Sequence, residues 1–88
     1  MPTISMFYGI IIRMYFAPEE HNPPHIHVYY QSETASININ TLELLQGKIP
    51  SKQMRMVLAW IEIHKDELLA NWALCQNGDT PFGIDPLK

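Results

Sequence analysis

The chain has 88 residues, of which 47% are hydrophobic, and this is enough for one domain with one core, spanning residues 1–88. Nine acidic residues outnumber six basic ones, which gives a formal net charge of −3 at pH 7. Nucleic acid is therefore not indicated as a partner by net charge, and neither is an anionic membrane surface.

The sulfur-containing residues indicate a reducing compartment. Cys75 is the only cysteine, so it cannot form an internal disulfide, and five methionines suit a cytoplasmic setting. The apolar residues 4–16 are too few to span a bilayer, and they lack a basic leader and a small-residue cleavage site. We therefore expect a cytoplasmic protein and interpret this segment as a strand.

The first half of the chain predicts antiparallel strands. Residues 4–16 form the first strand, with apolar side chains at even positions from 10 to 16, and residues 17–24 form a loop with three prolines. Residues 25–31 and 34–40 predict two further strands of a meander, because apolar and polar side chains alternate in them. Residues 41–47 are either a kinked continuation or a separate short strand.

The second half predicts one long helix. Pro50-Ser51 opens it, and no proline or glycine interrupts the chain before Gly78. Apolar residues recur at helical spacing, namely Met54, Val57, Leu58, Ile61, Leu68, Leu69 and Trp72. The fold class is thus α+β: a three- or four-stranded antiparallel meander packed on one face by a single long C-terminal helix. We expect residues 79–88 to pack back as an ordered apolar tail.

The two tryptophans lie on different sides of this helix. Trp60 and Trp72 are twelve positions apart, which separates them by about 120° around the axis. We expect Trp72 in the core and Trp60 on the surface, where it is a candidate for binding a partner.

Three of the four histidines, His21, His25 and His27, cluster around a Pro-Pro step. Residues two apart on a strand point to the same face, so His25 and His27 share one face while the apolar residues that alternate with them face the core. The same parity places further polar residues on that face: Arg13, Tyr15, Tyr29, Ser36 and Asn38.

Three interpretations of this face stay open. It is simply solvated, as one face of an antiparallel sheet often is. Alternatively, His21, His25 and His27 supply three nitrogen ligands to a divalent metal such as zinc, the number that a catalytic zinc site uses. In the third, His25 and His27 are catalytic acid–base groups and Arg13 contacts an anion, as in metal-independent RNA cleavage.

The chain also resembles the bacterial domain of unknown function 4160 family. The resemblance is carried by residues 1–5, Phe7-Tyr8-Gly9-Ile10, Ile12, Met14-Tyr15-Phe16, His21-Asn22-Pro23-Pro24-His25-Ile26-His27, His64, Leu68-Leu69, Asn71-Trp72 and Ile84-Asp85-Pro86-Leu87. Ile26 stands where the family usually has an aromatic residue.

The resemblance implies that the protein is encoded in a two-gene operon. Such gene pairs are suspected toxin–antitoxin modules. We therefore expect the effector-like, partner-binding half of such a pair, whose partner is a small protein encoded by a neighbouring gene. A histidine-dependent hydrolase that uses the His25/His27 face is the alternative. A non-catalytic, self-associating domain, hence a homo-oligomer, is the third hypothesis.

Overall fold

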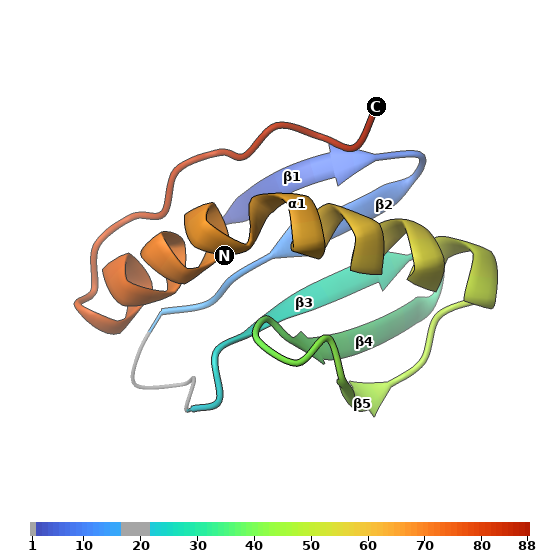
Figure 1. Cartoon of the computed structure of the whole chain (residues 1–88), viewed down its shortest axis with the longest axis horizontal. Helices are drawn as coiled ribbons and strands as arrows, with labels where there is room; N and C mark the ends of the chain where they lie inside the picture. The colour runs from blue at the N-terminus through green and yellow to red at the C-terminus, as the bar shows by residue number, and fades with distance from the viewer. Residues whose placement is uncertain (1, 17–21) are drawn as a thin grey trace.

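The computed structural model describes residues 2–16 and 22–88. Within these ranges the chain forms a five-stranded antiparallel sheet and one long helix (Figure 1). The elements in chain order are β1 (Thr3–Phe7), β2 (Ile10–Arg13), β3 (His25–Tyr30), β4 (Glu33–Asn38), β5 (Leu44–Gly47) and α1 (Ser51–Gln76). The spatial order of the strands is the same as their order in the sequence. The α+β class, the meander and the C-terminal helix are confirmed.

The single strand predicted over residues 4–16 is wrong. The segment is a hairpin of β1 and β2, in which Phe7 pairs with Ile10. Tyr8 and Gly9 between them both have positive φ, 49° and 78°, as a two-residue turn that matches the twist of paired strands requires. Apolar residues on both sides of the turn concealed it in the sequence.

The sheet has five strands where three or four were predicted, because residues 4–16 contain two strands and residues 41–47 contain the separate short strand that was one of the two alternatives there. A tight turn separates β4 from β5. The side chain of Asn38 stabilises it, since Oδ1 accepts hydrogen bonds from the backbone N–H groups of Asn40 and Thr41 at 2.8 and 3.0 Å. Leu42 in the same turn has φ of 64°.

The core lies between one face of the sheet and α1, which crosses that face (Figure 1). Alternate strand residues point toward the helix, as period-two patterning predicts. The side chains that are fully excluded from solvent there include Ile10, Ile12, Ile26, Val28, Ile37, Val57, Ile61 and Leu68. The opposite face of the sheet is left uncovered by α1.

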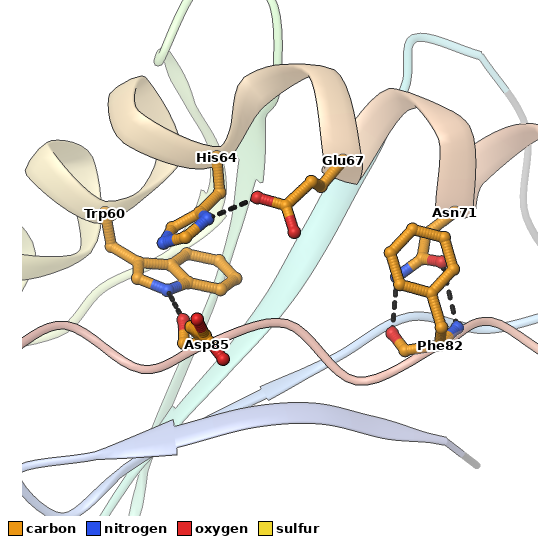
Figure 2. A network of polar contacts seen from close by, with 6 residues as sticks. All are labelled: Trp60, His64, Glu67, Asn71, Phe82 and Asp85. Atoms are coloured by element: carbon orange, nitrogen blue, oxygen red, sulfur yellow. Dashed lines mark hydrogen bonds and ion pairs between the residues drawn. The ribbon is translucent and has the colours of Figure 1, made fainter.

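The predicted exposure of Trp60 is wrong, and with it the prediction that this residue binds a partner. Its exposed fraction is 0%, its ring centre lies 5.4 Å from that of Phe7, and its Nε1–H donates to the Asp85 carbonyl at 2.8 Å. Trp72 is buried as expected. Both can be buried because the C-terminal tail, residues 79–88, covers a second side of the helix (Figure 2).

The tail runs back along α1 beside β1, so the expectation that it packs on the domain is confirmed (Figure 1). The Asn71 side chain donates to the Phe82 carbonyl at 2.8 Å and accepts from the Phe82 N–H at 2.9 Å. Further along, the Ile84 N–H donates to the Ile4 carbonyl at 2.8 Å. The tail thereby joins the helix to the first strand.

The helix backbone leaves helical geometry at His64, where φ is −110° and ψ is 21°. The His64 Nδ1 lies 2.6 Å from a carboxylate oxygen of Glu67, and its ring centre is 5.5 Å from that of Trp60 (Figure 2). With 14% of its side chain exposed, His64 is half-buried, and the Glu67 carboxylate satisfies its Nδ1. In the described ranges, no helix has the apolar length that crossing a bilayer requires.

Candidate functional site

The side of the sheet that faces away from α1 carries five of the polar residues predicted to share a face. We call it the open face and define it by Arg13, Tyr15, His27, Tyr29 and Ser36. Arg13 pairs with His27 across β2 and β3, and His27 pairs with Ser36 across β3 and β4. Directly paired residues of an antiparallel sheet project from the same side, so these three side chains form a row.

His27 is the centre of the open face. Its ring meets that of Tyr15 edge-on, with 4.5 Å between centres, and that of His25 in the same manner at 5.1 Å. Its Nδ1 is 3.4 Å from the hydroxyl oxygen of Ser36. The ring is therefore held by neighbours on both sides, which fixes its orientation relative to the sheet.

Arg13 is also fixed in place. Its guanidinium carbon lies 4.9 Å from the centre of the Tyr29 ring, a cation–π arrangement, and its Nε–H donates to the Thr3 hydroxyl at 3.3 Å. The hydroxyl groups of Tyr29 and Tyr15 are hydrogen-bonded to each other. Positive charge and two phenols thus stand within one cluster with His27.

The surroundings of Tyr29 raise its pKa from the ordinary value of 10.0 to about 12. Burial is the largest cause, because it penalises the charged phenolate, and the hydrogen bond and charge interaction with Tyr15 act in the same direction. Arg13 opposes both, since a nearby cation favours the phenolate. The phenol of Tyr29 is therefore a hydrogen-bond donor at neutral pH rather than a base.

This raised pKa has a measurable consequence at high pH. The folded chain keeps the Tyr29 proton in a range where the unfolded chain releases it, so the contribution to stability is present below pH 10 and is lost between pH 10 and about 12. We expect Tyr15→Phe to lower the Tyr29 pKa, because a hydrogen-bond partner that favours the neutral form is removed. Absorbance titration of tyrosinate in wild type and variant measures the shift, and an unchanged upper titration step would contradict the assignment.

His25 occupies a different position from His27. Its Nδ1 is 2.7 Å from the Pro23 carbonyl oxygen, which can only accept, so Nδ1 carries the proton and the neutral ring has its lone pair on Nε2. Its ring centre also lies 5.0 Å from that of Trp72. His25 thus links the open face to α1, a contact that strand parity did not predict.

A shallow hollow of about 450 Å³ lies on the β3, β4 and β5 side of the open face. Its lining is mostly polar and extends to the edge strand: His27, Tyr29, Thr34, Ala35, Ser36, Gln46 and Gly47. The hollow places the Ser36 hydroxyl and the His27 ring beside a space that can accept a small polar group.

Only two of the three predicted metal ligands, His25 and His27, lie within the described residues. His21 lies outside the described residues, and residues 2–16 and 22–88 contain no group of three or more metal-ligating side chains. His25 and His27 lie close together, but two nitrogens are fewer than the three protein ligands that a catalytic zinc site uses. Zinc binding through all three histidines stays a prediction.

The architecture and the open face define a small α+β domain in which one helix covers a meander sheet and the other sheet face presents histidine, tyrosine and arginine. Residues 9–73 match the model of the family described as Domain of unknown function (DUF4160). The match covers more than half of the chain, so the protein belongs to that family, as the resemblance implied. Neither the curated proteins nor the solved structures include a significant match.

Proposed function

We propose that the protein is the effector half of a two-protein, toxin–antitoxin-like pair, and that its activity is a histidine-dependent attack on a phosphodiester at the open face. The observation that carries this proposal is the row of paired side chains in which His27 stands between Arg13 and Ser36. A cation, an imidazole and a hydroxyl at adjacent positions are what an acid–base site for an anionic substrate needs.

The substrate class that fits is RNA, because its 2′-hydroxyl supplies the nucleophile. One imidazole takes the 2′-hydroxyl proton, the oxygen bonds to phosphorus, and the bond from phosphorus to the 5′-oxygen breaks. The other imidazole, in its protonated form, gives its proton to that leaving oxygen, and the products are a 2′,3′-cyclic phosphate and a 5′-hydroxyl. This chemistry needs no metal.

His25 and His27 fit the two proton-transfer roles, because their ring centres are 5.1 Å apart. Arg13 fits the anion contact, since its bond to Thr3 uses Nε and the terminal guanidinium N–H groups are further donors for phosphoryl oxygens. With a net charge of −3 the protein has no broad positive field to attract RNA, so the guanidinium of Arg13 supplies the positive charge at the site itself.

The proposed partner is a small protein encoded by a neighbouring gene, and the proposed setting is the cytoplasm. The support is the membership of the DUF4160 family together with the two-gene arrangement that the resemblance implies. In this arrangement the partner neutralises the effector, so the partner covers the open face or blocks access to it.

The test is expression of the chain alone and together with its neighbouring gene. We expect growth arrest that co-expression relieves. We expect His27→Gln to raise colony counts by at least about tenfold over wild type, because losing an acid–base group lowers a reaction rate roughly 100- to 10,000-fold. The stability of His27→Gln should stay within roughly 1 kcal/mol of wild type, because the residue is on the uncovered face.

The matched control is Tyr8→Gln, which changes an exposed aromatic residue away from the open face and should leave the arrest unchanged. Purified protein freed of metal by a chelator should still cleave a single-stranded RNA, because the proposed proton transfers use imidazoles alone. Cleavage restored only by added zinc would select the metal interpretation. A His27→Gln variant as toxic as wild type would overturn the proposal.

A further inference from the structure

The row of paired side chains on the open face continues beyond the three residues that carry the proposed chemistry. Ser36 on β4 also pairs with Gln46 on β5. The row therefore crosses four strands, in the order Arg13, His27, Ser36 and Gln46. Gln46 is exposed, and the hollow of about 450 Å³ lies along this half of the row. The guanidinium and the hollow thus stand on opposite sides of His27.

The lining of the hollow combines an aromatic ring with hydrogen-bonding groups. The Tyr29 ring is part of the lining, and Arg13 from β2 lies over one of its faces. The other face of the ring is turned to the hollow, because the hollow lies toward β4 and β5. The hydroxyls of Thr34 and Ser36 and the carboxamide of Gln46 supply both donors and acceptors. A flat ring beside such groups is what an unstacked nucleobase requires.

We propose that the hollow binds the base of the nucleotide whose 2′-hydroxyl attacks, and that Gln46 determines which base is accepted, with adenine preferred. This rests on the function proposed above, in which the phosphoryl group lies at Arg13 and the imidazoles. The base of that nucleotide then lies beyond His27, on the side of the hollow. Gln46 is two strand spacings from His27, about 10 Å, which a ribose and a base together can bridge.

Adenine is the base that a glutamine side chain matches with two hydrogen bonds. The amide NH₂ group donates to N7, and the amide oxygen accepts from the N6 amino group. A glutamate at the same position can only accept, so it favours the N4 amino group of cytosine instead. Because Gln46 does not touch the reacting atoms in this arrangement, its replacement changes which RNA is cleaved while the two imidazoles still act.

Four oligonucleotides test the proposal, each a deoxyribose strand with one ribonucleotide: adenosine, guanosine, cytidine or uridine. Only the bond that follows the ribonucleotide has a 2′-hydroxyl to attack it, so kcat/KM is measured for one base at a time. We expect the wild-type chain to prefer adenosine about tenfold, the scale of one bidentate pair. Gln46→Ala should bring the ratios close to one, and Gln46→Glu should favour cytidine over adenosine. Ratios are compared because an added carboxylate also repels the RNA backbone.

The matched control is Gln31→Glu, which makes the same change at an exposed residue in the turn between β3 and β4. Gln31 lies outside the lining of the hollow, so the ratios between bases should stay as in the wild-type chain. Circular dichroism and urea midpoints show that each variant is folded. The midpoints should be close to that of wild type, because both glutamines are exposed.

Binding of adenosine 3′-monophosphate, followed by amide chemical shifts, separates this inference from the proposed function. If the wild-type chain cleaves none of the four oligonucleotides, the function fails. The inference then survives only if this nucleotide shifts the amides of Ser36 and Gln46 and binds at least about tenfold more weakly to Gln46→Ala. Absence of such binding would overturn it.

Cleavage that is equal after all four bases would overturn the inference and leave the proposed function standing. A preference for a base other than adenine would do the same. So would a preference for adenine that Gln46→Ala and Gln46→Glu leave unchanged, or one that Gln31→Glu alters as strongly as Gln46→Glu does.

Discussion

Replacing Trp60 with alanine should cost about 3 to 5 kcal/mol of unfolding free energy, the usual range for deleting a buried aromatic side chain. The indole is fully excluded from solvent, packs against Phe7 and hydrogen-bonds the Asp85 carbonyl, so the variant loses packing and leaves a carbonyl without its donor. A loss of this size is a large part of the stability of a small domain. Urea unfolding followed by circular dichroism measures it.

Two companion variants separate the contributions. Trp60→Phe keeps an aromatic ring but removes the Nε1–H, so it should cost roughly 1 to 3 kcal/mol. Ile63→Ala changes a residue on the same helix that is 67% exposed, and it should stay within about 0.5 kcal/mol of wild type. Equal midpoints for Trp60→Ala and Ile63→Ala would mean that the tail does not bury the indole in solution.

Asn71→Ala should be the second most damaging change, at roughly 2 to 4 kcal/mol, because one side chain satisfies both the N–H and the carbonyl of Phe82. The Asn71 side chain itself has no exposed surface, so water cannot replace the lost bonds without opening the contact between tail and helix. Denaturant midpoints give the cost, and amide exchange at Ile84 should rise with it.

The matched control for Asn71 is Asn77→Ala, which removes the same side chain from an exposed position at the end of α1. It should change the free energy of unfolding by no more than about 0.5 kcal/mol. If Asn71→Ala were as mild as this control, or if exchange at Ile84 were unaffected, the amide would not be what holds the tail.

Periodicity predicted the helix and the faces of the strands well, because burial on one side imposes a pattern on the residues themselves. It failed at Tyr8-Gly9, where apolar residues on both sides of a turn gave no polar signal. It failed again at Trp60. The angle of about 120° between the tryptophans was sound, but the inference assumed that the helix buries one side only, and the tail covers a second.

The open face was predictable to the extent that it follows from parity. Arg13 and His27 share it because paired positions in an antiparallel sheet point the same way. The contact between His25 and Trp72 depends on where the helix ends relative to β3, which no local pattern encodes. Asn71 did leave a signal, since an amide within an apolar stripe requires partners when it is buried.

Because the tail is C-terminal to α1, the helix is synthesised before the residues that cover it. Residues 82–85 are translated after α1, yet they supply the partners of the Asn71 amide and the Trp60 indole. While the helix is already made and these residues are not, a polar amide and a large aromatic ring lack their final neighbours. During that interval the nascent chain therefore exposes a helix surface that is prone to aggregation, and folding is completed only after the tail has been synthesised.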